Sequence, residues 1–140
     1  MKKITNAWAI LLALALVGGC ASSPSTQVDR VALLEERVNE RWALLLAKEY
    51  FDAWEYLSPG AKSAVDATSY ARRLSLTQVV WKNARFIDSQ CESEDVCSAR
   101  ISITVEVKTG MPMAGNVETT QVASEDWVWS DTNWYYVPKP

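Results

Sequence analysis

The sequence predicts a single α+β domain in which N-terminal helices pack on one face of an antiparallel sheet of about four strands. Apolar residues recur at helical spacing in the first half of the chain and alternate with a period of two in the second half. Helices that precede a run of strands are typical of α+β domains, with the helices gathered on one face of the sheet. The length of 140 residues leaves room for one domain.

The first 19 residues have the three parts of an export signal. Lys2 and Lys3 precede an apolar run from Ala7 to Val17, and the small residues Gly18 and Gly19 follow it. At roughly 1.5 Å per residue the run would cover about half of a bilayer core, so a permanent transmembrane helix is disfavoured. We therefore expect residues 1–19 to be a signal peptide.

The segment Leu16-Val17-Gly18-Gly19-Cys20 resembles the lipobox of bacterial lipoproteins. The resemblance implies that Cys20 carries a lipid and is the first residue of the mature chain. It also implies that Ala21, standing where Asp would favour retention in the inner membrane, sends the protein to the outer membrane, facing the periplasm. Residues 20–28 are then expected to be a lipidated tether, and residues 29–140 the folded domain. An ordinary signal peptide with an incidental cysteine is the alternative.

With Cys20 assigned to the lipid, two cysteines remain for the folded domain. Cys91 and Cys97 flank an acidic, turn-like stretch and would lie in an oxidising compartment, so we expect a disulfide that clamps the end of a β-hairpin. Closing so short a loop contributes about 2 kcal/mol to stability. A redox or metal role is the alternative, but the spacing is not that of a CxxC pair and histidine is absent.

Three helices are expected before the strands. The first runs from Asp29, its expected N-cap, to about Tyr50, and a shorter one ends near Leu57 because Ser58-Pro59-Gly60 marks a turn. A third starts near Thr68. The apolar positions that predict the first helix are Val31, Leu34, Val38, Trp42 and Leu45.

Strands occupy the second half of the chain. The segment from Val79 to Ile87 is rich in β-branched and aromatic residues, and apolar and polar residues alternate strictly from Ile101 to Lys108. Residues 110–115 are expected to be a loop. Two more strands, 117–129 and 133–137, complete the meander.

Several of these features together resemble the NTF2-like superfamily (cystatin-like, SnoaL-type). They are the long first helix, the segment FDAWEYLSP at 51–59, the helix carrying Tyr70, and the aromatic hairpin from Trp127 to Tyr136. The resemblance implies a sheet curved into a cone whose mouth binds a small apolar molecule. It also implies two alternatives, an isomerase or dehydratase with a carboxylate base and a homodimer formed sheet to sheet.

Composition excludes several classes of function. The chain has 14 Lys and Arg against 17 Asp and Glu, with no histidine, so it lacks the basic surplus of a nucleic-acid binder. The absence of histidine removes the commonest general base and the commonest metal ligand. We expect no cofactor and no metal, and we expect the acidic residues between Cys91 and Cys97 to be a solvated hairpin tip.

The candidate binding residues are aromatic. Core filling is the alternative for most of them, but Trp127 and Trp129 point to the same face of a strand, and an uncovered face would be an interaction patch. The candidate residues for binding a ligand or partner are Tyr50, Trp54, Trp81, Trp127 and Trp129. The candidates for isomerase chemistry are Tyr50, Asp52, Tyr56 and Asp126, with helix capping as the alternative role of Asp52.

The sequence thus favours a non-enzymatic, membrane-anchored periplasmic domain that binds an envelope protein or a small apolar ligand. A small-molecule enzyme and a structural homodimer are the two rival hypotheses. A carboxylate facing an enclosed pocket would favour the enzyme.

Overall fold

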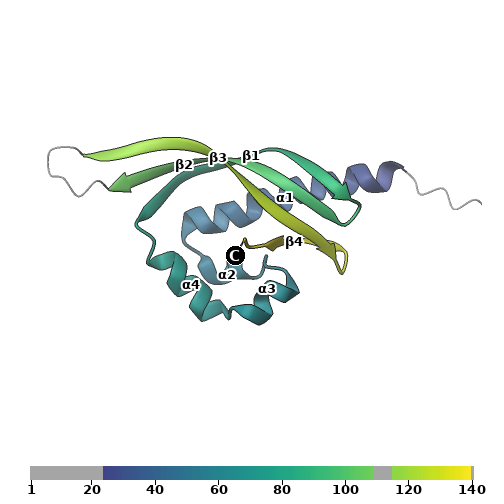
Figure 1. Cartoon of the computed structure of the whole chain (residues 1–140), viewed down its shortest axis with the longest axis horizontal. Coiled ribbons are helices and arrows are strands. Elements are labelled where there is room, and N and C mark those ends of the chain that lie inside the picture. Colours follow the sequence, from purple (N-terminus) through teal and green to yellow (C-terminus); the bar gives the residue numbers. More distant parts are fainter. Residues whose placement is uncertain (1–23, 109–114, 140) are drawn as a thin grey trace, which may run out of the picture.

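The α+β architecture is confirmed by a computed structural model that describes residues 24–108 and 115–139. The helices lie on one side of a twisted sheet (Figure 1). The elements are α1 (Pro24–Ala47), α2 (Tyr50–Trp54), α3 (Pro59–Ala64), α4 (Ala67–Ser75), β1 (Val79–Ser93), β2 (Val96–Lys108), β3 (Asn116–Ser130) and β4 (Asn133–Val137).

The sheet is an antiparallel meander with the strand order β1-β2-β3-β4. β2 and β3 pair without interruption from Val96↔Val128 to Lys108↔Asn116, whereas β1 pairs with β2 through three register shifts. β4 pairs only with the last part of β3, from Asp126 to Ser130. The sheet stays open, with β1 at one edge and β4 at the other.

Helix α1 lies along the sheet because its apolar residues share one face. Leu34, Val38 and Leu45 are buried there, at the spacing that the sequence predicts. The helix begins at Pro24, within the stretch expected to be a tether, so Asp29 lies inside it and the expected cap at Asp29 is wrong. Proline is tolerated in the first turn of a helix, because the N–H group that it lacks would have no helical partner there. The division of the chain at residues 19 and 28 stays a prediction.

Two short helices start at side-chain caps. Ser58 precedes α3 and its hydroxyl accepts a hydrogen bond from the Ala61 N–H at 3.3 Å, while Pro59 occupies the first turn. The expectation that Ser58-Pro59-Gly60 is only a turn is therefore wrong, since proline there starts a helix. Asp66 caps α4 by accepting from the Ser69 N–H at 2.9 Å.

The junction between α1 and α2 is a Schellman motif with lysine at its left-handed position. The Glu49 N–H donates to the Leu44 carbonyl at 2.9 Å, and the Lys48 N–H donates to the Leu45 carbonyl at 3.2 Å. Lys48 has φ of 63°, a conformation that glycine adopts with less strain. The turn directs the chain from α1 into α2.

The core lies between α1 and the inner face of the sheet. Alternate residues of β2 from Cys97 to Val105 are buried, and Trp127 and Trp134 are the largest fully buried side chains. The Trp134 indole N–H donates to the Arg30 carbonyl at 2.8 Å, so α1 and β4 are joined near the start of the helix. The polar tip of a buried indole is satisfied in this way.

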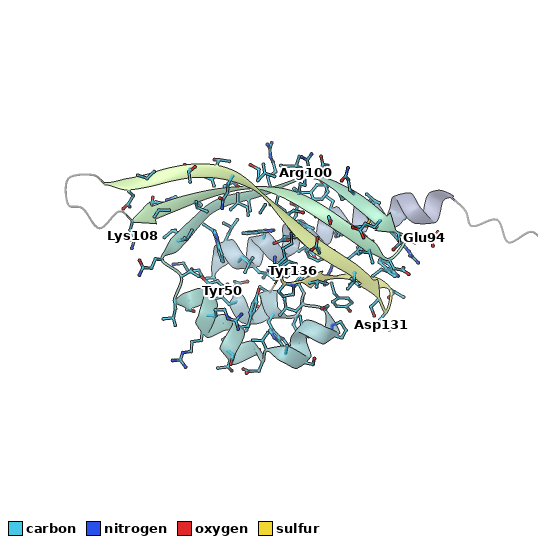
Figure 2. The ribbon with its side chains drawn as sticks, viewed as in Figure 1. Tyr50, Glu94, Arg100, Lys108, Asp131 and Tyr136 are labelled. Atoms are coloured by element: carbon cyan, nitrogen blue, oxygen red, sulfur yellow. A yellow bond between two sulfur atoms is a disulfide. The ribbon has the colours of Figure 1, made fainter. Side chains whose placement is uncertain are left out.

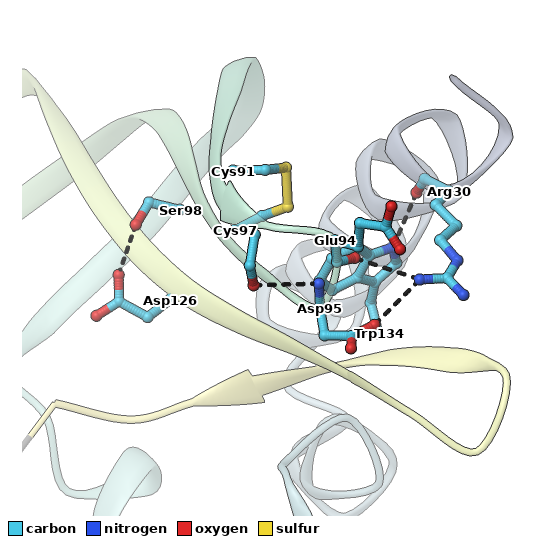
Figure 3. Close-up of a disulfide and its surroundings, with 9 residues drawn as sticks. Arg30, Cys91, Glu94, Asp95, Cys97, Ser98, Asp126 and Trp134 are labelled. Atoms are coloured by element: carbon cyan, nitrogen blue, oxygen red, sulfur yellow. Dashed lines mark hydrogen bonds and ion pairs between the residues drawn. A yellow bond between two sulfur atoms is a disulfide. The ribbon is translucent and has the colours of Figure 1, made fainter. Parts of the chain in front are cut away.

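The disulfide between Cys91 and Cys97 is confirmed, and it joins directly paired residues near the end of the β1–β2 hairpin. The Arg30 guanidinium contacts the Asp95 carboxylate at 3.0 Å and the Glu94 carbonyl at 3.3 Å (Figure 3). These contacts fasten the hairpin end to the first turns of α1. The strand β1 therefore reaches Ser93, beyond the expected end at Ile87.

Candidate functional site

An apolar groove opens where α1 and α4 end and β1 begins. Its volume of about 370 Å³ lies within the range of small-molecule pockets. Tyr50, at the start of α2, lies in the layer of helices beneath the sheet (Figure 2). The lining residues are Leu45, Leu46, Lys48, Tyr50, Phe51, Ala71, Leu74, Ser75, Thr77, Val79, Val80 and Trp81.

The core holds one wall of the groove in place. The Trp81 ring meets the ring of Trp42 edge to face, with a centroid distance of 5.7 Å and an interplanar angle of 80°. Trp42 belongs to α1 and is buried. Trp81 is half-buried, so it is braced from below while part of its surface remains accessible in the groove.

The polar side chains that line the groove are Lys48, Tyr50, Ser75 and Thr77, and of these only Lys48 carries a charge. The hydroxyls of Ser75 and Thr77 donate to carbonyls of α4, at 2.8 Å to Ala71 and 3.0 Å to Leu74. Lys48 is exposed and makes no side-chain hydrogen bond or ion pair within the described part of the chain. No lining residue is Asp or Glu. The groove therefore offers apolar walls and one cation.

An exposed apolar row continues from the groove across the sheet. Val79 lines the groove, pairs with Val107, and Val107 pairs with Val117, so all three face the helix side. Their relative exposures are 38%, 40% and 52%. Alternation would bury this face, but the helices end before they cover it (Figure 1). Contiguous apolar surface of this kind marks interaction sites.

A buried ion pair lies in the interior, outside the groove lining. The Arg41 guanidinium contacts the Glu125 carboxylate at 2.8 Å, and the two side chains are only 6% and 8% exposed. Arg41 also contacts the Tyr70 hydroxyl at 3.4 Å and lies 3.8 Å from the centroid of the Tyr136 ring. The pair joins α1 to β3. Either charge alone would be strongly destabilising in this interior of low dielectric constant, so the two side chains are held together.

The pair and its surroundings perturb two pKa values. Burial alone would lower the pKa of Arg41, but the charge of Glu125, with smaller contributions from Tyr70 and Tyr136, raises it above its ordinary value. Burial raises the pKa of Tyr136. Arg41 therefore stays charged and Tyr136 stays neutral near neutral pH, and the contacts of Arg41 make this cluster a structural tie between α1 and β3.

Of the five aromatic candidates, Tyr50 and Trp81 both line the groove. Trp54 instead donates its indole N–H to the Val65 carbonyl at 2.8 Å, which ties α2 to the end of α3. Trp127 is fully buried, so the hypothesis of an exposed Trp127–Trp129 patch is wrong. That face of β3 is the inner face. Trp129 packs edge to face on Trp134 at 5.4 Å.

The polar candidates lie outside the groove. Asp52 is exposed in the first turn of α2, and the N-cap of that helix is Glu49, so Asp52 neither caps a helix nor faces the groove. Asp126 accepts from the Ser98 hydroxyl at 2.9 Å (Figure 3), and the Tyr56 hydroxyl donates to Glu40 at 2.9 Å. The three residues are therefore not brought together as an acid–base set.

Sequence reasoning missed four residues that shape these two sites. Lys48 and Phe51 line the groove, and Arg41 and Glu125 form the buried pair. Periodicity gave a partial signal, because Arg41 lies next to the buried position Trp42 and Glu125 lies two residues before Trp127 on the same strand face. Their pairing joins segments that are far apart in the sequence.

Other expectations concern metals and membranes. Within residues 24–108 and 115–139, no cluster of three potential metal ligands is present. The helices of the same residues include none that is both long and apolar enough to span a bilayer. Cys20 and the expected signal lie outside the described residues.

Comparison with known proteins defines the fold. The sequence matches no protein-family model and no curated protein. The structure is similar to the solution structure of a SEC-C motif containing protein from Rhodopseudomonas palustris, with a TM-score of 0.59 and 14% identity, covering 81% of this chain and 84% of that one. The likeness establishes a shared α+β fold.

The resemblance to the NTF2-like superfamily is corrected by this comparison. The similar structure is a SEC-C motif protein, and no family model supports the NTF2-like assignment. Helices followed by an aromatic meander satisfy the packing needs of any open sheet covered on one face, so that order does not identify a family. The lipobox resemblance gains no support from the comparisons either.

Proposed function

We propose that the protein is a lipid-anchored, periplasm-facing binding domain without enzymatic activity, and that its groove takes a small apolar ligand bearing an acidic group. The observation that carries the proposal is the lining of the groove, which combines aliphatic and aromatic walls with the single cation Lys48 and no carboxylate. Chemistry that depends on a carboxylate base would need an Asp or Glu at this surface.

The size and charge of the groove define the ligand class. Its volume of about 370 Å³ lies near the lower end of the range for small-molecule sites. A chain or ring system of that size would cover the apolar walls. An acidic head would then reach Lys48 at the rim, where an ion pair in contact with solvent contributes up to about 1 kcal/mol.

Two features favour export and anchoring. The charged start, apolar run and small residues before Cys20 have the arrangement of a cleaved signal. The disulfide between Cys91 and Cys97 is of a kind that persists in oxidising compartments. We therefore place the protein at the outer membrane, with Cys20 as its point of attachment.

The anchored end and the groove lie at opposite ends of α1. Cys20 precedes the start of the helix at Pro24, whereas Leu45 and Leu46 line the groove. At about 1.5 Å per residue, the helix separates Pro24 from Leu45 by roughly 30 Å. An anchored molecule would therefore present its groove away from the attachment point, where it can meet a ligand in the periplasm.

Titration calorimetry tests the ligand class. Decanoate and its neutral analogue decanol are titrated into the exported chain carrying Cys20→Ser, which removes the need for detergent. We expect decanoate to bind, with a negative heat-capacity change from apolar burial, and decanol to bind up to about fivefold more weakly. Equal affinities would contradict the role of Lys48, and no binding of either probe would overturn the proposal.

Matched variants assign the binding to the groove. Leu46→Glu places a carboxylate in the lining and should weaken both probes, whereas Ala43→Glu on the exposed part of α1 should weaken neither. Lys48→Ala should weaken decanoate alone, and the exposed Lys82→Ala should leave it unchanged. Loss of binding in the control variants would place the site elsewhere.

Cell fractionation tests the anchor. We expect Cys20→Ser to move the protein from the membrane to the soluble periplasmic fraction, because the net negative charge of the chain disfavours electrostatic adhesion to anionic lipid. Unchanged membrane association of this variant would contradict lipidation at Cys20.

A further inference from the structure

The first two thirds of β3 form an unpaired sheet edge. Residues 116–125 pair with β2 on one side only, because β4 begins to pair with β3 at Asp126. Every second residue of such a strand directs its N–H and C=O groups outward. An exposed edge of this length is a template for the addition of another strand.

The opposite edge of the sheet is protected, which makes the β3 edge unusual. Three register shifts in β1 interrupt the regular row of N–H and C=O groups along its free edge. In addition, the Phe86 N–H donates to the Asn39 side chain of α1 at 3.4 Å. The β3 edge runs in unbroken register with β2 and contains no proline or lysine. Glu118 is its single exposed charge. The protections found on β1 are missing here.

We propose that this edge pairs with the same edge of a second copy, in antiparallel register about a two-fold axis at Thr120. The free edge is bounded by β4 at Asp126 and by the start of β3 at Asn116, so its midpoint lies at Thr120 and Gln121. When two copies of this strand pair antiparallel about the midpoint, the free edge of each copy is paired along almost its whole length. The result is a continuous eight-stranded sheet, twice the four strands of one chain.

The side chains select the register centred on Thr120. In this register Val117 lies opposite the partner's Ala123 on the helix-facing side, and Glu118 lies opposite the partner's Val122 on the outer side. A register centred on Gln121 would instead place Val117 opposite the partner's Glu125. The Glu125 carboxylate is held by Arg41, so this register would set an apolar side chain against a charged one.

A register centred on Val122 is worse, because it would oppose two acidic side chains, Glu118 and the partner's Asp126. Like charges directly opposite each other on neighbouring strands are destabilising. The Thr120 register opposes no like charges.

Pairing would also cover exposed apolar surface. Val117 and Val122 are 52% and 60% exposed, and they lie on opposite faces of the edge strand. Val117 ends the apolar row that begins in the groove at Val79. The second copy would extend that row with its own Ala123, so each groove would open onto a longer apolar surface.

Thiol crosslinking of the full chain tests both the pairing and its register. Thr120→Cys should give an adduct of twice the chain mass with a short bifunctional reagent, since directly opposed Cβ atoms lie about 5 Å apart. Val122→Cys is the matched control on the same outer face. Its two copies would lie about 14 Å apart along the strands and should not react with the same reagent. Both positions are exposed, so neither change disturbs the core.

Sedimentation gives the second measurement. We expect a dimer for the native chain, and a monomer for Thr120→Lys, which opposes two ammonium groups at the axis. A native monomer at every concentration reached, with no adduct at position 120, would overturn the proposal. Reaction at position 122 without reaction at position 120 would indicate another arrangement of the two copies and would overturn the proposal. An adduct with a different protein would indicate that a strand of that protein occupies the edge, and it would also overturn the proposal.

Discussion

Removing the charge of Glu125 should destabilise the domain strongly. Glu125→Gln keeps the shape of the side chain but leaves the Arg41 guanidinium, only 6% exposed, without its anion. Breaking a buried ion pair from one side costs about 3–5 kcal/mol. That is a large fraction of the 5–15 kcal/mol expected for a whole domain. At about 4 °C per kcal/mol for a domain of this size, the melting temperature should fall by roughly 12–20 °C.

Urea unfolding followed by circular dichroism measures this loss, and a double variant separates its causes. Arg41→Met combined with Glu125→Leu removes both charges and keeps apolar volume, so it should recover most of the lost stability. The slope of the unfolding free energy against urea should stay constant, because the surface exposed on unfolding is unchanged. A loss below about 1 kcal/mol in Glu125→Gln would refute the argument, since it would mean that water reaches Arg41.

Three further predictions concern other elements. Replacing Cys91 and Cys97 together by serine should lower the unfolding free energy by about 2 kcal/mol, and a reductant should then have no additional effect on the urea midpoint. Lys48→Gly should raise the unfolding free energy by about 1 kcal/mol, because glycine adopts its positive φ without strain, while decanoate affinity falls; a stability loss would contradict the strain. The hydrogen bonds from Ser69 lower the pKa of Asp66, so their stabilisation is present above about pH 4 and lost as the pH falls through the folded-state pKa. Asp66→Asn keeps a helix cap that does not titrate. Between pH 5 and pH 2 the urea midpoint of this variant should therefore fall less than that of the native chain, because the variant lacks the pH-dependent stabilisation by Asp66. Equal falls of the two midpoints would contradict the assignment.

The sequence by itself determined the fold class and most of its elements. Helical spacing located α1 and its buried face, alternation located β2, and the distance between Cys91 and Cys97 gave the disulfide. These features are local, because each depends on residues close together in the chain whose period or spacing has one structural solution. Helix ends were harder to predict. Pro59 starts α3 although the same residue also suits a turn.

The tertiary structure alone decided which surfaces are free and which are covered. Trp127 and Trp81 both belong to strand patterns, yet the helices bury Trp127 and leave Trp81 in a groove. The pairing of Arg41 with Glu125 and the unpaired edge of β3 also depend on segments that are distant in the sequence. Periodicity states which face of an element is apolar, but where neighbouring elements end decides how much of that face meets solvent, and this is a property of the packed molecule.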